Sequence, residues 1–362
     1  METGGVQTIG ETHVGTGGPA GPGNTAPTAR ARGRSAGRRA QVLLRRFGAI
    51  GALVILLIVA EGLNPNFLTA DNIRAQLQIF ALNAALIAVG QTLVILTGGI
   101  DLSVGSLLAV GSALAGILVG GGASSSTPLA LVFILPIALT TLLGGISGAI
   151  ITKARIQPIV VTLAMSIAAR GLAQLITGGG GHGHTLDVSS ATDFDNIAIA
   201  QLGPVPVIGS IPVSVILVLV VFALAALFLT RTVPGRYVFA VGGNERAARL
   251  SGISADRVKI VVYAVSGLLA GLAGVLFSSY NATSDPFNDG LYYELQAISA
   301  VVVGGTSLLG GVGGVWRTLI GGLILTVLNA LIIQVGLQRP AQLIVQGLII
   351  AGAVILQAGG ES

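Results

Sequence analysis

A single acidic side chain stands out in this sequence. Asp101 is the only ionisable residue between Arg74 and Lys153, and it lies in the run Thr97-Gly-Gly-Ile-Asp-Leu-Ser-Val-Gly105. A charge at the centre of a bilayer costs about 3 kcal/mol on insertion scales, so an acid in such an apolar stretch needs a purpose. We predict that Asp101 and Ser103 shape a helix break beside a transport path. Asp101 would cap the helix that follows.

The pattern of paired glycines before Asp101 occurs again later in the chain. The runs 94–105 and 301–311 are both apolar and are both interrupted by two adjacent glycines with a hydroxyl side chain nearby. Interrupted helices in corresponding halves of a transporter indicate its substrate path. The abundance of glycine would also produce such a match, so both explanations stay open. The glycines assigned to the breaks are Gly98, Gly99, Gly304 and Gly305.

Polar side chains within apolar segments are further candidates for the path. Gln76, Asn83 and Gln91 fall within about 80° of one another on a helix, which gives segment 74–97 a polar stripe. Such amides either bond neighbouring helices, at about 0.6 kcal/mol each, or recognise the hydroxyl groups of a solute. Arg170 lies deep in another apolar segment and needs a partner or water. Asp101 is its candidate partner by charge, although simple topology places the two at opposite depths.

The composition is that of a membrane protein. Charged residues make up 9% of the 362 residues and hydrophobic ones 52%, whereas soluble domains carry about 25% charged residues. Glycine accounts for 54 residues, and the pairs Gly144/Gly148 and Gly267/Gly271 have the spacing that lets two membrane helices approach closely. The absence of cysteine excludes disulfides and thiolate metal sites.

The apolar runs predict an all-α, polytopic inner-membrane protein with about ten transmembrane segments, including interrupted or re-entrant helices. A spanning helix needs about 20 mostly apolar residues. The run 293–304 is too short to cross alone, so we expect a half-helix or re-entrant segment there. The predicted segments are 47–63, 74–97, 102–120, 129–151, 157–177, 213–230, 257–279, 293–304, 315–336 and 340–358.

The loops predict the orientation. Loops 178–212 and 280–292 contain aspartates but neither Lys nor Arg, whereas 152–156 and 231–256 are rich in both. The positive-inside rule therefore places the basic loops in the cytoplasm, loop 178–212 outside and both termini inside. Residues 1–40, rich in Gly, Pro, Ala and Thr with arginines toward the end, are predicted to be a disordered cytoplasmic tail. The permease domain would occupy 41–358.

The longest cytoplasmic loop, 231–256, is predicted to contain a short helix. Asn244 can cap it, Glu245 suits its first turn, and Gly252 would end it. Ala247, Ala248 and Leu250 would then form a small apolar face beside basic residues that include Arg246. Such a helix either lies at the lipid interface or docks into a groove on a soluble partner, and the residues alone leave this open.

No catalytic, cofactor or metal site is predicted. The lysines, Lys153 and Lys259, are not preceded by the glycines of a phosphate-binding loop. His182 and His184, two residues apart in a glycine-rich stretch, fit a flexible surface loop better than a metal site. The arginines before the first apolar run are interpreted as a membrane flank that contacts lipid, and no nucleic-acid partner is expected.

Five ordered motifs resemble the permeases of ribose-type (simple-sugar) ATP-binding-cassette (ABC) importers, in the branched-chain amino acid/sugar permease family. The resemblance covers about residues 47–358. It implies that 244–253 is a coupling helix, with Asn244, Glu245, Arg246, Ala247, Leu250 and Gly252 contacting an ATPase subunit. It also implies a permease homodimer and an extracytoplasmic sugar-binding protein. The motifs are Gly90–Ser106, Ile156–Leu163, Ala169–Gly171, Gly242–Ile253 and Ala300–Leu308.

The expected function is therefore to translocate a simple sugar, a pentose or a hexose, with ATP hydrolysed by a separate subunit. The chain would not be an enzyme by itself. One rival is a secondary transporter, in which Asp101 and Arg170 carry ion coupling. Others are a channel or scaffold, and a branched-chain amino-acid permease, which is a weaker match in motif.

Overall fold

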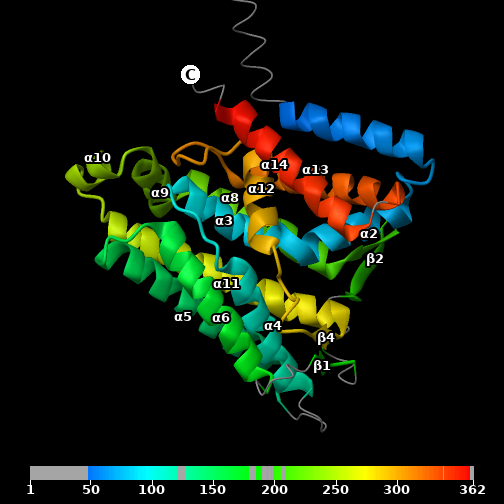
Figure 1. The fold of residues 1–362 in the computed structure, drawn as a ribbon, viewed down its shortest axis with the longest axis horizontal. Coiled ribbons are helices and arrows are strands. Elements are labelled where there is room, and N and C mark those ends of the chain that lie inside the picture. The colour runs from blue at the N-terminus through cyan, green and yellow to red at the C-terminus, as the bar shows by residue number, and fades with distance from the viewer. Residues whose placement is uncertain are drawn as a thin grey trace, which may run out of the picture. The chain divides into compact units, whose positions relative to one another are not determined.

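The structure is a computed structural model that describes residues 48–120, 127–178, 185–189, 194, 197, 199–205, 209–336 and 338–358. The predicted tail, its arginines and the two outer-loop histidines lie outside these residues. Helices provide nearly all the regular structure in the described part (Figure 1). The helices are Gly48–Leu63, α2 (Ala70–Phe80), η1 (Ala81–Ala85), α3 (Leu86–Leu96), α4 (Val104–Gly120), α5 (Leu129–Lys153), α6 (Pro158–Ile176), α8 (Val213–Arg231), α9 (Val233–Gly243), α10 (Glu245–Leu250), α11 (Ala255–Asn281), α12 (Tyr293–Val303), α13 (Val315–Gln334) and α14 (Arg339–Ala358).

The all-α, polytopic membrane fold is confirmed. Six helical stretches of the described residues are long and apolar enough to cross a membrane, and each of the ten predicted segments coincides with a helix. Their boundaries differ by a few residues. The helix of the second predicted segment begins at Ala70 instead of residue 74. The prediction excluded the charged Asp71 and Arg74, but both side chains are accommodated near the start of this helix.

Helix α3, together with the turn η1 before it, forms the centre of the described bundle. Every residue of α3 is buried, and its apolar residues do not gather on one side. A helix that is apolar all round belongs inside the protein and not at the lipid boundary. In contrast, α5, α6 and α8 each leave large apolar side chains exposed, including Leu142, Ile167 and Leu224, as helices that face lipid or a partner do.

Small residues allow the helices around this centre to pack closely. A Cβ atom on Gly144 would collide with the Tyr263 carbonyl oxygen, and one on Gly267 would collide with the Thr140 carbonyl oxygen. The close helix approach predicted from the glycine spacing is therefore confirmed, and the structure shows that α5 and α11 are the two helices that meet there. Backbones this close gain dispersion contacts that bulkier residues would prevent.

The short helix α12 lies in the middle of the helices in Figure 1. It contacts α3, α13 and α14, while α4, α5, α6 and α11 pack together beside it and α11 also packs against α3. With 11 residues, α12 rises about 16 Å, roughly half of a bilayer core. The prediction of a short, interrupted segment here is confirmed.

Among the described residues, four short strands lie in the two loops predicted to be outside. β2 (Gln201–Val205) and β3 (Gly209–Pro212) form an antiparallel hairpin in which Leu202 opposes Ile211. β1 (Leu186–Asp187) pairs with β4 (Thr283–Ser284), which joins the loop before α8 to the loop after α11. The strands were not predicted, because two to five residues carry too little alternation to be recognised.

Candidate functional site

Asp101 is fully buried in a cluster of hydroxyl groups between α3 and α4. Its Oδ1 accepts hydrogen bonds from the Ser103 N–H (2.9 Å) and the Ser103 hydroxyl (2.6 Å). Its Oδ2 accepts a third from the Ser266 hydroxyl of α11 (3.0 Å). The carboxylate therefore closes the turn just before α4 begins at Val104, and the N–H that it binds precedes the helix instead of lying in its first turn.

Gln91 and Tyr263 complete the surroundings of Asp101. With its amide oriented to pair, Gln91 donates to the Asp101 carbonyl oxygen (3.1 Å) and accepts from the Asp101 N–H (3.2 Å). The buried Tyr263 hydroxyl finds no hydrogen-bond partner among the described residues, and a Cβ on Gly99 would collide with it. Sequence reasoning missed Tyr263, although a tyrosine in a mostly aliphatic segment was a visible signal.

The two glycine breaks meet each other and the end of α9. The Gly311 N–H donates to the Leu96 carbonyl oxygen (3.0 Å), and a Cβ on Gly310 would lie 2.8 Å from the Gly98 nitrogen. A Cβ on Gly242 would collide with the same Leu96 carbonyl oxygen. We name these five residues the glycine junction. It brings the break before Asp101, the break after α12 and the segment leading to α10 into backbone contact.

The glycines of the second break have separate roles. A Cβ on Gly304 would collide with the Arg317 carbonyl oxygen of α13, so this position holds α12 against α13. Gly305 has a φ of +86°, in the left-handed region that favours glycine. Its carbonyl oxygen accepts a hydrogen bond from the Arg317 guanidinium (3.1 Å). The chain thus leaves α12 and turns sharply toward the glycine junction.

Arg170 does not pair with Asp101. Its guanidinium donates to the carbonyl oxygens of Pro286 (3.0 Å) and Asp289 (2.7 Å), in the loop between β4 and α12. The nearby carboxylates of Asp289, Asp285 and Glu294 attract it. Asp289 in turn accepts from the Ser112 hydroxyl of α4 (2.5 Å). Arg170 therefore links α6 to the loop that leads into α12. The spacing of residues in the sequence did not reveal this contact.

Replacing Arg170 with methionine should destabilise the folded protein by about 3 kcal/mol, because two buried carbonyl groups and nearby carboxylates would lose their cation. Arg170→Lys should lose less, since an ammonium group keeps the charge but makes fewer bonds. Thermal unfolding of the purified chain measures both. The exposed Arg246→Met is the matched control, and equal midpoints for Arg170→Met and this control would contradict the assigned role.

The short helix α10 has the end structures predicted for it. The Asn244 side chain accepts from the Ala247 N–H (2.9 Å), which is an N-cap. At the other end, Gly252 has a φ of +83° and donates to the Arg249 carbonyl oxygen, while the Ile253 N–H donates to that of Ala248 (both 3.0 Å). This pair of bonds is a Schellman motif. The predicted N-cap at Asn244 and the predicted helix end at Gly252 are both confirmed.

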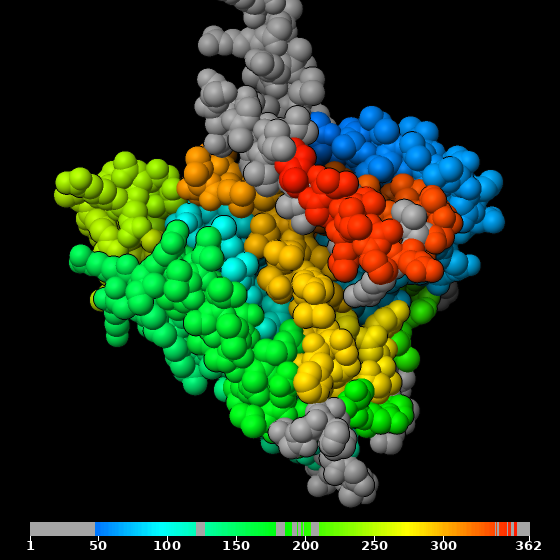
Figure 2. All heavy atoms as spheres, in the orientation of Figure 1, coloured from blue at the N-terminus to red at the C-terminus, as the bar shows by residue number. Residues whose placement is uncertain are grey.

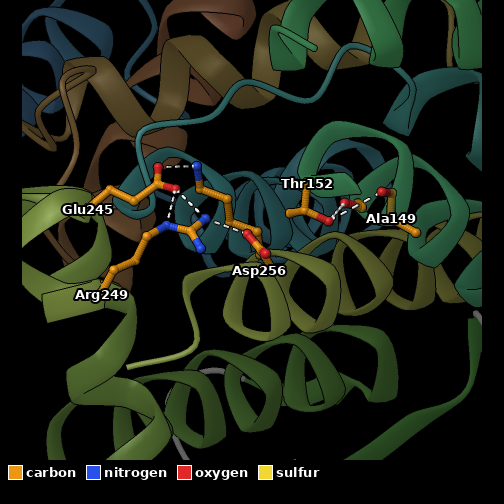
Figure 3. A network of polar contacts seen from close by, with 7 residues as sticks. Ala149, Thr152, Glu245, Arg249 and Asp256 are labelled. Carbon is orange, nitrogen blue, oxygen red and sulfur yellow. Dashed lines mark hydrogen bonds and ion pairs between the residues drawn. The ribbon is translucent and has the colours of Figure 1, made fainter. Parts of the chain in front are cut away.

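Ion pairs hold α10 against α11 (Figure 3). Glu245 accepts from Lys259 (2.6 Å) and Arg249 (2.8 Å), and Arg249 also pairs with Asp256 at the start of α11. Burial would raise the pKa of Glu245, but the hydrogen bonds from Lys259 and Arg249 outweigh it and lower the pKa. Glu245 is thus ionised at neutral pH. Its role is to position α10.

The outer side of α10 is left open. Ala248 is buried, whereas Leu250 is 85% exposed and Arg246 and Ala247 are exposed as well. In Figure 2 the yellow-green surface of α9 and α10 stands out at one edge, and the orange loop after α12 lies on the same side. An exposed leucine beside a basic side chain, on a helix fixed at both ends, is suited to docking on another surface.

A family model described as "Branched-chain amino acid transport system / permease component" matches residues 74–354. The chain belongs to this family. It is 42% identical to the ribose import permease protein RbsC of Haemophilus influenzae over 304 residues, which are 84% of this chain and 90% of the relative. It is 41% identical to RbsC of Bacillus subtilis over 315 residues, 87% of this chain and 93% of the relative. The predicted resemblance to ribose-type permeases is confirmed.

Less similar members of the permease family are named after other sugars. The fructose import permease protein FruG of Bifidobacterium longum is 32% identical over 321 residues, 87% of this chain and 91% of the relative. No solved structure matches the chain. The protein is thus an integral membrane component of a transport system, and all of its predicted site residues lie within the matched region.

Proposed function

We propose that this chain is the membrane permease of an ABC importer that carries a simple sugar, a pentose or a hexose, into the cell. Its similarity to proteins named ribose import permease, at 41–42% identity over at least nine tenths of their length, carries the proposal. A permease has no ATP site of its own. The energy would come from ATP hydrolysed by a separate cytoplasmic subunit.

Helix α10 is the element through which we expect the ATPase subunit to act. Leu250, Arg246 and Ala247 would contact a groove of that subunit, while Asn244, Glu245 and Gly252 hold the helix in place. The fixed ends support this role, because a docking helix transmits force only if it cannot rotate freely on its own loop. The glycine junction would pass the movement to both helix breaks.

The remaining partners follow from the same proposal. An extracytoplasmic sugar-binding protein would deliver the solute to the side of loops 178–212 and 280–292. A second copy of the chain would complete the pore, and membrane lipid would cover the rest of the exposed apolar surface. The protein would lie in the inner membrane with both termini in the cytoplasm, as the basic loops favour.

Leu250→Asp combined with Arg246→Glu should reduce sugar-stimulated ATP hydrolysis at least tenfold, because the substitutions reverse the apolar and basic character of the exposed side of α10. Hydrolysis by the reconstituted complex in proteoliposomes is the measurement. Lys153→Ala, another exposed cation of the predicted cytoplasmic side, is the control. If sugar still stimulated ATP hydrolysis fully in the double variant, α10 would not be the docking helix.

The rival transport mechanisms give different results in the same vesicles. An ion-coupled transporter would accumulate sugar without ATP and lose uptake when the ion gradient is collapsed. An amino-acid permease would carry leucine in preference to sugars. Since Asp101 and Arg170 are bonded to different parts of the structure, they do not form one ion relay, which favours the ATP-driven mechanism.

A further inference from the structure

A cavity of about 610 Å³ opens beside the central helix, apart from the Asp101 cluster. Its walls come from α2, η1, α12, α13 and α14, and the lining includes the side chains of Asn83 and Gln296. We call it the amide-lined cavity. Its volume lies within the range of about 300–1,000 Å³ typical of small-molecule sites. Gln91, the third amide of the predicted stripe, points instead to Asp101. The predicted stripe is therefore divided between the amide-lined cavity and the Asp101 cluster.

The central helix changes its winding at this cavity. Residues Ala81–Ala85 form a π-helical turn, and Asn83 is its middle residue. A π turn costs backbone hydrogen-bond energy and is frequent at functional sites, where it redirects a side chain. Here the turn is held by Phe80, whose ring contacts Phe222 and lies so close to Gly322 that a Cβ there would collide with it. Packing thus supports a costly local geometry.

The amides at the turn are available to a ligand. Within the described residues, the side chains of Asn83 and Gln296 form no hydrogen bond, although both are partly buried and line the cavity. Burying an amide without a partner costs about 1–3 kcal/mol in proteins, so these groups need water or a solute to satisfy them. An acyl chain would leave them unpaired. Apolar side chains such as Ile79 and Leu325 line most of the remaining wall, so the cavity suits a solute that has both hydroxyl groups and an apolar face.

The lining also indicates which polar solute. All of its residues belong to the described part, and none of them is Asp, Glu, Lys, Arg or His. A zwitterionic amino acid would bury its ammonium and carboxylate groups there without counter-charges, at high cost. An amide both donates and accepts, as a sugar hydroxyl does. Phe80 and Tyr292 also line the cavity, and an aromatic ring can pack against the C–H side of a sugar ring.

We infer that the amide-lined cavity binds a neutral, polyhydroxylated solute through Asn83 and Gln296, and that it rejects amino acids by its lack of charge. The inference rests on the proposed function, because it assigns to this cavity the solute that the permease carries. It adds that discrimination between sugars and amino acids occurs within the membrane protein and does not depend wholly on a soluble binding protein.

The absence of native cysteine makes a direct binding test straightforward. Ala84→Cys and Thr326→Cys, at two lining positions that leave Asn83 and Gln296 in place, would each carry one thiol. A water-soluble methanethiosulfonate reagent would modify it in the full-length chain in nanodiscs. D-ribose or D-xylose at 100 mM should slow modification at both positions at least fivefold, whereas 100 mM L-leucine should not. Lys153→Cys, at the exposed end of α5 on the predicted cytoplasmic side, should be modified at a rate that sugar does not change.

Three results of the labelling would overturn the inference. They are equal protection by leucine and the sugars, no protection by either sugar, and no modification of either thiol, which would mean that water does not reach the cavity. The measurement needs no ATPase, so it decides the inference even if the energy source of the proposed function is wrong.

Uptake provides the second readout. Asn83→Leu and Gln296→Leu should each reduce ATP-driven sugar uptake at least tenfold at equal amounts of membrane protein. Gln174→Leu removes an amide of α6 that does not line the cavity and should leave uptake unchanged. Sugar uptake by the wild type together with full uptake by both cavity variants would refute the inference alone. Absence of ATP-dependent sugar uptake by the wild type would refute the proposed function.

Discussion

Gly242→Ala is expected to abolish transport, although it adds one methyl group. The new Cβ would collide with the Leu96 carbonyl oxygen and lie 2.7 Å from the Gly311 nitrogen, which share a hydrogen bond of 3.0 Å. Backbone atoms cannot move aside as a side chain can, so α9 would have to shift away from both helix breaks. Overpacking of this kind costs about 1–3 kcal/mol or more. Coupled uptake should fall more than tenfold.

The neighbouring glycine supplies a matched control. A Cβ on Gly243 meets no atom within 4 Å, and the residue does not have a positive φ. Gly243→Ala therefore adds the same methyl group one position further along and should leave uptake and membrane level unchanged. Initial sugar uptake in proteoliposomes containing equal amounts of each variant makes the comparison. Equal activity of the two variants would show that the glycine junction does not transmit movement.

Asp101→Leu is expected to prevent stable folding, whereas Asp101→Asn should be tolerated. Leucine would leave the Ser103 N–H and the hydroxyls of Ser103 and Ser266 without their acceptor, in a fully buried place. Each unsatisfied group costs about 1–3 kcal/mol, so the sum is a large part of a typical folding free energy. Asparagine keeps one acceptor oxygen for Ser103, and the Ser266 hydroxyl can turn to accept from its amide.

The amount of folded protein in the membrane and the uptake rate at equal amounts separate the explanations. We expect little folded Asp101→Leu protein, and Asp101→Asn protein near the wild-type level with uptake reduced no more than a few-fold. If Asp101 carried a proton, asparagine would fold normally but transport no better than leucine. Such a result would favour the ion-coupled mechanism over the structural role.

The features that the sequence predicted well are those with a local cause. Asn244 and Gly252 fix the ends of α10 through bonds made within a few residues, and those residue types are the signal for such ends. The same holds for the glycine spacing of α5 and α11, since a residue without a side chain at every fourth position has few other uses in a membrane helix.

The features that were missed depend on contacts between distant segments. The glycine junction joins Leu96, Gly242 and Gly311 through backbone atoms, which leave no pattern of side chains to read. The partners of Arg170 are backbone carbonyl groups, which any sequence supplies, so charge alone suggested Asp101 instead. The π turn at Asn83 adds one residue to a turn within a continuous helix, and no residue type marks it.

The division between the amide-lined cavity and the glycine junction has a consequence for redesign. The cavity is built from side chains, so its preference for one solute over another is open to substitution. The junction is built from backbone atoms, so substitutions at Asn83 or Gln296 do not alter its contacts. Exchanging cavity residues should therefore give variants that carry other solutes, while the backbone contacts that couple the two helix breaks to α9 and α10 stay intact.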